Sequence, residues 1–208
     1  MLSQKKPQFE RYLEPLAKLL HGVNPNILTL LGSIPSLLFF VFLINHWYMP
    51  ALLIFLGNAF DMLDGMVARK YHKTTAFGGF LDSFMDRISD FFIITAFAFS
   101  GLVRWEIAAP LLLFAYLTSY ARSRGELASH VHPSGGGMNV ANTTVSFAIG
   151  LIERTERLVL IFITLLFYML VPDLKINGLN AAEIVFLLIA GLSLITVLQR
   201  IIYAYRKL

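Results

Sequence analysis

Residues 61–90 read DMLDGMVARKYHKTTAFGGFLDSFMDRISD and separate two strongly apolar stretches of the chain. This segment contains Asp61, Asp64, Asp82 and Asp86, and Asp90 follows one helical turn later. An aspartate at the centre of a membrane costs about 2.5–3.5 kcal/mol on insertion scales, so such residues normally face a polar cavity. The segment therefore predicts a polar functional site within a membrane domain.

The composition supports a membrane protein. The chain has 208 residues, of which 57% are hydrophobic and 14% are charged, whereas a soluble domain carries about 25% charged residues. High hydrophobicity also excludes disorder, which needs low hydrophobicity and high net charge. The absence of cysteine excludes disulfides, thiolate catalysis and cysteine metal sites.

Apolar stretches of roughly 17–25 residues are long enough to cross the hydrocarbon core of a bilayer. We expect six such spans, and we expect the short fourth and fifth to extend into the polar stretch between them. The predicted spans are Ile27–Asn45, Met49–Ala68, Phe80–Gly101, Ile107–Tyr120, Leu158–Val171 and Ala182–Tyr205. The predicted fold class is all-α: a polytopic integral membrane protein whose residues 27–208 form one six-helix membrane domain.

Residues 1–26 predict an amphipathic helix at the membrane interface, with a plain cytosolic tail as the alternative. They lack an early apolar core and a small-residue cleavage site, so no removable signal peptide is expected. Apolar side chains recur among the charges at helical spacing; they are Phe9, Tyr12, Leu13, Leu16, Leu19 and Leu20.

The lysines and arginines fall mostly on one side of the predicted spans. Only Arg104 and Lys175 fall on the opposite side. By the positive-inside rule, both termini and the aspartate-rich segment are expected on the cytoplasmic side of the cell membrane.

The four aspartates predict divalent-metal chemistry. Asp61 and Asp64 are three residues apart, and Asp82 and Asp86 are four apart, so each pair shares one helical face. Clustered carboxylates repel unless they protonate or share cations, and all-oxygen ligands suit Mg²⁺, which favours sites completed by phosphates. Phosphoryl transfer, with two metals and one carboxylate as base, is the predicted chemistry. Structural polar contacts or an ion pathway are the alternatives.

Two small residues and an arginine accompany the first aspartate pair in the sequence. Gly65 and Ala68 continue the helical face of Asp61 and Asp64, which allows a ligand or helix to approach closely, and Arg69 follows. The spacing D-x2-D-G-x2-A-R-x8-G-x3-D-x3-D is met at every fixed position. This pattern resembles the signature of the CDP-alcohol phosphotransferase family, which implies a six-span enzyme that transfers a phosphate-linked group from a CDP-alcohol to a second alcohol and releases CMP.

The resemblance also implies roles for residues. Asp61 and Asp82 would bridge two Mg²⁺ ions, with Mn²⁺ as a substitute; Asp64 would complete one site, and Asp86 would complete the other while acting as general base. The CDP-lipid would be held by residues of the signature and of the Pro25-Asn26-x2-Thr29 feature. These residues are Asn26, Thr29, Gly65, Ala68, Arg69, Thr75 and Gly78.

Arginines near the cytoplasmic ends of later spans predict a phosphorylated acceptor, because arginine pairs bidentately with phosphate oxygens. Ordinary positive-inside topology is the alternative for any single arginine. The runs Ser119–Glu126 and Glu153–Arg157, with Gln199-Arg200, are similar to those of the phosphatidylinositol phosphate and archaetidylinositol phosphate synthase branch. That resemblance implies that inositol phosphate is held by Ser119, Arg122, Arg154, Arg157 and Arg200.

The sequence departs from the branch in two places, of which the first preserves charge but not geometry and the second concerns the entrance of the acceptor site. Arg122 stands where many members have lysine, and the loop His130–Thr144 is longer than expected. His130 and His132 in this loop suggest a transition-metal site only weakly, since a third ligand is missing.

The predicted function is transfer of the phosphatidyl-type group of CDP-diacylglycerol or CDP-archaeol to inositol 1-phosphate. The alternatives are a phosphatidylglycerophosphate synthase that uses glycerol 3-phosphate, an enzyme that joins CDP-inositol to inositol phosphate, and a cation or proton-coupled transporter. Membrane lipids and a second copy of the chain are the other expected partners, and no nucleic acid is expected.

Overall fold

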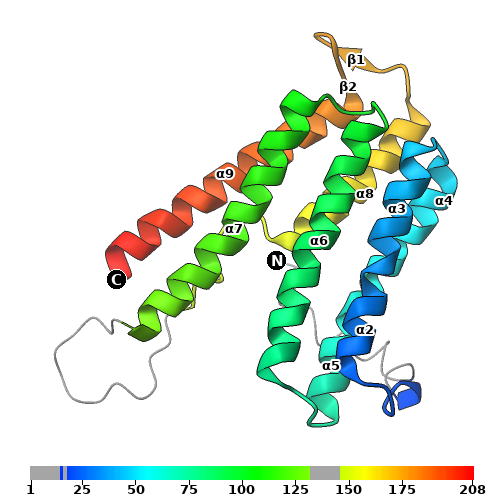
Figure 1. Cartoon of the computed structure of the whole chain (residues 1–208). Helices are drawn as coiled ribbons and strands as arrows, with labels where there is room; N and C mark the ends of the chain where they lie inside the picture. Colours follow the sequence, from blue (N-terminus) through cyan, green and yellow to red (C-terminus); the bar gives the residue numbers. More distant parts are fainter. Residues whose placement is uncertain (1–14, 16–17, 132–145) are drawn as a thin grey trace.

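The computed structural model describes residue 15, residues 18–131 and residues 146–208. The described chain is built almost entirely of helices, with one short β-hairpin (Figure 1). Residues 1–14, 16 and 17, which make up most of the predicted amphipathic helix, lie outside the described residues. The elements are α2 (Pro25–Gly32), α3 (Ile34–Ile44), α4 (Tyr48–Phe55), η2 (Leu56–Asp61), α5 (Met62–Lys70), α6 (Ala76–Phe99), α7 (Trp105–Val131), α8 (Arg154–Leu170), β1 (Lys175–Ile176), β2 (Leu179–Asn180) and α9 (Ala181–Lys207).

Each predicted span corresponds to helical structure, and two are interrupted. The first span is α2 followed by α3, with Ser33 between them, and the second is α4, the 3₁₀ segment η2 and α5. The polar stretch between the fourth and fifth spans lengthens α7 to Val131 and brings the start of α8 forward to Arg154. The expected extension of these two helices is therefore confirmed.

The break in the second span lies close to the start of α3. A Cβ on Gly57 would lie 3.0 Å from Cγ of Pro35, so the glycine lets η2 approach the start of α3 closely. A 3₁₀ stretch within a helix marks local strain or a hinge. Because η2 ends at Asp61 and α5 begins at the next residue, this irregular turn places the first aspartate pair.

Aromatic side chains hold the apolar core together. The ring of Phe39 on α3 lies 5.1 Å from that of Phe55 on α4 and 6.0 Å from that of Phe97 on α6. Phe97 in turn lies 4.8 Å from Phe186 on α9. Because Phe39, Phe97 and Phe186 are fully buried, these ring contacts connect α3 and α9 to α6.

Three helical segments of the described chain are long and apolar enough to cross a membrane. They are Pro25–Ile44, Tyr48–Lys70 and Ala181–Lys207. The other long helices are more polar or shorter: α6 carries Asp82, Asp86, Arg87 and Asp90, and α8 has 17 residues. The total of six spans stays a prediction.

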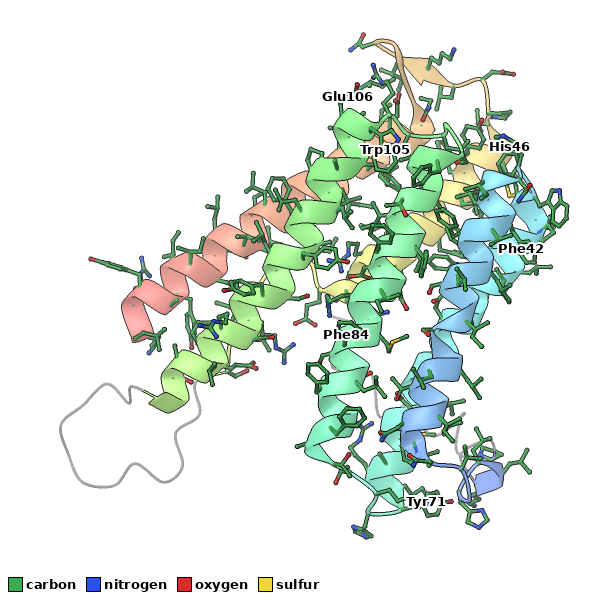
Figure 2. All side chains as sticks on the ribbon, in the orientation of Figure 1. Phe42, His46, Tyr71, Phe84, Trp105 and Glu106 are labelled. Carbon is green, nitrogen blue, oxygen red and sulfur yellow. The ribbon has the colours of Figure 1, made fainter. Side chains whose placement is uncertain are left out.

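Trp105 and Glu106, at the start of α7, lie at the same end of the bundle as the β-hairpin (Figure 2). The two cations that the sequence places on the opposite side lie in or next to these elements. Lys175 is in β1 of the hairpin, and Arg104 directly precedes α7. Nε of Arg104 lies 2.7 Å from the buried carboxylate of Glu183 in the first turn of α9. The connection between α5 and α6 and the end of α9 lie away from the hairpin (Figure 1).

The segment before α8 is fixed against its neighbours by two glycines. A Cβ on Gly125 of α7 would lie 2.6 Å from the buried ring of Phe147, and one on Gly150 would lie 2.3 Å from Cγ2 of Thr196 on α9. Gly150 also has φ of +144°, and the hydroxyl of Thr196 accepts from the next two backbone N–H groups. These contacts hold the segment that leads into α8.

We expect Gly125→Ala to destabilise the protein by about 1–3 kcal/mol, because the buried ring of Phe147 has no room for the added methyl group. The measurement is the thermal unfolding midpoint in detergent. Gly191→Ala in α9 is the control, since nothing lies within 4 Å of its added Cβ and alanine favours a helix interior by about 0.5–1 kcal/mol. A midpoint that is the same or higher in Gly125→Ala would contradict this account of the packing.

Candidate functional site

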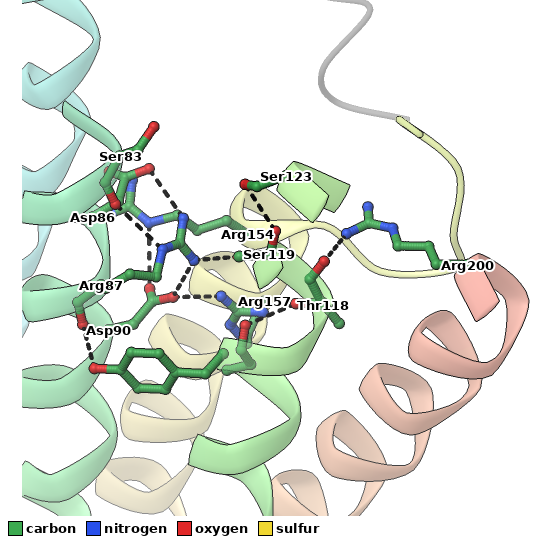
Figure 3. A network of polar contacts seen from close by, with 12 residues as sticks. Ser83, Asp86, Arg87, Asp90, Thr118, Ser119, Ser123, Arg154, Arg157 and Arg200 are labelled. Atoms are coloured by element: carbon green, nitrogen blue, oxygen red, sulfur yellow. Dashed lines mark hydrogen bonds and ion pairs between the residues drawn. The ribbon is translucent and has the colours of Figure 1, made fainter. Parts of the chain in front are cut away.

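A network of charged side chains lies between α6, α7 and α8 (Figure 3). Helix α6 contributes Asp86, Arg87 and Asp90, and the first turn of α8 contributes Arg154 and Arg157. Helical spacing places Asp86 and Asp90 on the same face of α6. The start of α8, held by the packing described above, therefore delivers two arginines to the face of α6 that carries the predicted base.

Asp90 is the most buried carboxylate of this network and contacts three arginines. Its side chain is 2% exposed. Oδ2 lies 2.6 Å from Nη2 of Arg157 and 3.4 Å from Nη1 of Arg87, and Oδ1 lies 3.3 Å from Nε of Arg154. Since a buried charge is tolerated only when it is paired and hydrogen-bonded, these contacts explain how Asp90 can lie inside the bundle.

Arg154 joins the two carboxylates of α6. Its Nη1 lies 2.5 Å from Oδ1 of Asp86, and its Nε faces Asp90. Asp86 also lies 3.6 Å from Nη2 of Arg87. Asp86, the predicted general base, thus lies beside Arg87 and Arg154. Both arginines also contact Asp90, the next carboxylate on α6.

Helix α7 is connected to the network through Arg87. Nη1 of Arg87 donates to the hydroxyl of Ser119, and the hydroxyl of Tyr116 donates to the backbone carbonyl of Arg87 at 3.0 Å. Ser119, which was predicted to hold the acceptor, therefore lies beside the charged side chains of α6.

Arg157 has one donor that faces no protein acceptor in the described part of the chain. The residue is 1% exposed, and its Nε has no hydrogen-bond partner among the described residues. A buried polar atom without a partner costs free energy, so it calls for an explanation such as a bound ligand or water. Arg157 therefore combines a fixed guanidinium group with a donor that an anionic ligand would satisfy.

The other two predicted acceptor arginines differ in exposure. Arg200 is buried, and it donates to the carbonyl of Ile149 at 2.8 Å and to that of Thr118, the residue before Ser119. Arg122 is exposed on α7 and pairs with Glu126 at 3.1 Å. Arg200 therefore lies next to Ser119 and binds backbone carbonyl groups there. Arg122 lies about one helical turn after Ser119 on α7.

Asp64 of α5 lies in a second polar region, next to α2. It is 6% exposed. It accepts from the hydroxyl of Thr29 and from the backbone N–H of Gly65, while the Thr29 hydroxyl also lies 3.1 Å from the carbonyl of Pro25. Two residues predicted to hold the CDP-lipid, Thr29 and Gly65, therefore orient a predicted metal ligand.

The remaining residues predicted for the CDP-lipid form two close groups. A Cβ on Gly78 would lie 3.1 Å from Oδ1 of Asn26 and from Oγ1 of Thr75, so these three residues meet at the start of α6. A Cβ on Gly65 would lie 3.1 Å from Nη1 of Arg69, which makes room for that guanidinium group. Ala68 is half-buried on the same helix, α5.

The predicted metal ligands are oxygen donors on η2, α5 and α6. Asp61 ends η2, and its side chain lies outside the description; among the described side chains, no three of His, Asp or Glu are grouped closely enough to hold a metal ion. The donor chemistry of Asp64, Asp82 and Asp86 fits Mg²⁺, which takes carboxylates and substrate phosphates. The four-carboxylate metal site stays a prediction.

Two residues of the network, Arg87 and Asp90, had been given no role from the sequence. The signal for Asp90 was its spacing, because Asp82, Asp86 and Asp90 continue one face of α6 at intervals of four. Nothing in the sequence indicated that Arg87 would reach Ser119 on another helix, since that contact joins residues separated by 32 positions.

Comparison with known proteins gives a consistent result. The CDP-alcohol phosphatidyltransferase family matches residues 22–197. The chain is 37% identical to an archaetidylinositol phosphate synthase of Pyrococcus horikoshii, over 100% of this chain and 98% of that protein. It is 30% identical to a phosphatidylinositol phosphate synthase of Streptomyces avermitilis, over 96% and 80% of the two chains.

The fold is also found in solved structures. The crystal structure of Mycobacterium tuberculosis phosphatidylinositol phosphate synthase with CDP-DAG bound superposes with a TM-score of 0.74 at 24% identity, over 94% of both chains. The structure of that protein in complex with manganese and citrate also gives a TM-score of 0.74 at 24% identity, over 92% of this chain and 88% of the other. At this identity the likeness establishes the shared fold.

We expect Arg157→Met to lower the free energy of unfolding by about 3–5 kcal/mol, because Asp90 would lose its shortest partner inside the bundle. Arg122→Met is the matched control: its pair with Glu126 is exposed, and its loss should cost less than about 1 kcal/mol. Thermal or denaturant unfolding in detergent measures both variants. Equal destabilisation by the two substitutions would show that burial of the Asp90 pair does not matter.

Proposed function

Because the chain belongs to the CDP-alcohol phosphatidyltransferase family, we propose that it transfers the phosphatidyl-type group of a CDP-linked lipid to inositol 1-phosphate and releases CMP. The observation that carries this proposal is the contact of 2.5 Å between Arg154 and Asp86. It brings a phosphate-binding cation next to the predicted base, as a phosphorylated acceptor requires. The names of the relatives from Pyrococcus and Streptomyces support the same acceptor class.

The donor is proposed to bind near the start of α6. Asn26, Thr75 and Gly78 meet there, and the N-terminus of a helix favours anionic groups such as phosphate. Arg69, next to Gly65 on α5, would add a cation for the CDP group. The Mycobacterium structure with CDP-DAG supports a CDP-lipid as donor. Both a diacylglycerol and an archaeol lipid are compatible with this proposal, because lipid tails are recognised by apolar packing.

The proposed metal ligands are Asp61, Asp64, Asp82 and Asp86. When bound, two Mg²⁺ ions, or Mn²⁺ in their place, would neutralise negative charge on the donor's phosphates. The contact of Asp64 with Thr29 supports a fixed ligand geometry on α5. The complex of the Mycobacterium protein with manganese and citrate supports a divalent metal in this fold.

In the proposed reaction, Asp86 accepts the proton of an inositol hydroxyl group. The hydroxyl oxygen forms a bond to the phosphorus nearest the lipid, the bond from that phosphorus to the CMP oxygen breaks, and CMP leaves with the electron pair. The phosphate of the acceptor is held by Arg154 and by Nε of Arg157, which has no hydrogen-bond partner among the described residues. Orientation of the hydroxyl by these arginines supplies the proximity that such a transfer needs.

The other acceptor residues extend this pocket. Ser119 is held beside the network by Arg87, and Arg200 lies against the residue before it. Arg122, on the exposed part of α7, would meet the acceptor as it enters. For Arg200 this role uses guanidinium N–H groups other than those bound to the carbonyls of Thr118 and Ile149.

The chain is a multi-pass membrane enzyme of this family. We further propose that the site opens to the cytoplasm, that both termini lie on that side, that the spans number six and that two copies pair. Family membership decides against the transporter alternative. A phosphatidylglycerophosphate synthase remains the main competing activity, because glycerol 3-phosphate also carries a phosphate for the arginines.

The test is release of CMP by the purified protein with a CDP-lipid and a panel of acceptors. We expect Mg²⁺-dependent release with inositol 1-phosphate, and at least about tenfold lower kcat/KM with glycerol 3-phosphate, free inositol and serine, because they lack either the ring or the phosphate. Removal of Mg²⁺ with a chelator should abolish release. A preference for glycerol 3-phosphate would overturn the acceptor while leaving the family unchanged.

Asp86→Asn should slow CMP release at least about 100-fold, because the amide cannot accept the proton. Asp173→Asn in the exposed turn before β1 is the matched control and should keep full activity. Near-normal release by Asp86→Asn at saturating Mg²⁺ would exclude Asp86 as the base.

Arg154→Ala should raise KM for inositol 1-phosphate by about tenfold or more, because a charge-assisted contact with the phosphate is lost. KM for the CDP-lipid should change much less. Arg104→Ala, which removes an arginine paired with a carboxylate at the far end of the bundle, should leave both constants unchanged. An equal rise of both KM values in Arg154→Ala would argue against a specific role in acceptor binding.

A further inference from the structure

Asp90 lies outside the family signature, one helical turn after Asp86. We infer that Asp90 is a positioning residue for acceptor recognition: its buried carboxylate holds Arg154 and Arg157 so that they receive the acceptor's phosphate, without itself touching substrate. The inference rests on the proposed function and deepens it. It follows from the contacts, the charge and the burial of this one side chain.

The contacts of Asp90 use both of its oxygens. Oδ2 binds Nη2 of Arg157 at 2.6 Å, and Oδ1 faces Nε of Arg154 at 3.3 Å. The two arginines are three residues apart in the first turn of α8, so they point to the same side of that helix. One carboxylate on α6 therefore determines the position of two guanidinium groups on another helix.

The position that results suits a phosphate. Arg154 uses Nε for Asp90 and Nη1 for Asp86, and Arg157 uses Nη2 for Asp90 while its Nε has no partner among the described residues. A long arginine side chain loses rotamer freedom when it binds a ligand. Because Asp90 fixes both side chains in advance, less of that entropy is lost when the acceptor binds.

The charge of the network also favours an anion. Arg87, Arg154 and Arg157 carry three positive charges against the two negative charges of Asp86 and Asp90, so one positive charge remains. Without Asp90, the arginines would repel one another with only Asp86 between them. Asp90 thus permits the cations to lie close together while leaving the network positive.

The test compares Asp90→Asn with the wild-type protein in the CMP-release assay. Asparagine keeps the shape of the side chain but removes its charge, so Arg154 and Arg157 should lose their fixed positions. We expect KM for inositol 1-phosphate to rise about tenfold while KM for the CDP-lipid changes less than about twofold. Glu183→Gln is the matched control, because it neutralises a buried carboxylate paired with an arginine at the opposite end; both KM values should stay unchanged.

A second variant separates positioning from folding. Asp90→Glu keeps the charge but adds a methylene group, which displaces the carboxylate relative to the arginines. We expect the protein to fold with a somewhat lower unfolding midpoint, because the added methylene enters a buried site. KM for inositol 1-phosphate should be about threefold higher. If Asp90→Asn does not fold, this variant alone decides.

The inference is overturned if a folded Asp90 variant keeps the wild-type KM for inositol 1-phosphate, or if both KM values rise equally. These outcomes leave the proposed function intact, since the wild-type protein still uses inositol 1-phosphate. A wild-type protein that does not use this acceptor overturns the proposed function itself. If it uses glycerol 3-phosphate instead, the same variants are measured with that phosphate, and the same two outcomes decide.

Discussion

A buried pair of opposite charges lies at the centre of this apolar helical bundle. Asp90 is 2% exposed and Arg157 is 1% exposed, and neither would be tolerated there alone, because an unpaired ion in a medium of low dielectric constant carries a large desolvation penalty. Oδ2 of Asp90 lies 2.6 Å from Nη2 of Arg157, so each charge is neutralised by the other. This pairing requires the first turn of α8 to lie against the middle of α6, and this juxtaposition also brings Arg154 to Asp86.

The packing around α8 serves the same contact. Gly125 lets the ring of Phe147 lie on α7, and Gly150 lets the chain pass over Thr196 of α9 before α8 begins. Glu153 caps the helix through its reciprocal bonds with Glu156. These packing contacts and the cap lie outside the charged network. The position of the arginines therefore depends on packing as well as on electrostatic attraction.

Much of the candidate site was open to prediction from the sequence. The spacing of the aspartates, Gly65, Arg69 and Gly78 identified the family, and the comparisons confirmed it. Residues predicted for the CDP-lipid, such as Asn26 and Gly78, do meet in the structure, although they are far apart in the chain. The roles of Arg87 and Asp90 were not predicted, because their partners lie on other helices and helical periodicity describes only one helix at a time.

The membrane character, the location of the helices and the chemistry of the oxygen ligands could be predicted from the sequence, because hydrophobicity, periodicity and residue type are local properties. Which charges neutralise one another became visible only in the folded bundle. Arg154 and Arg157 read in the sequence as two cations near the end of a span, equally suited to lipid headgroups or to a substrate. Their contacts with Asp86 and Asp90, across 64 positions or more of the chain, give them a defined place, since pairing of buried charges depends on distances that only the folded bundle sets.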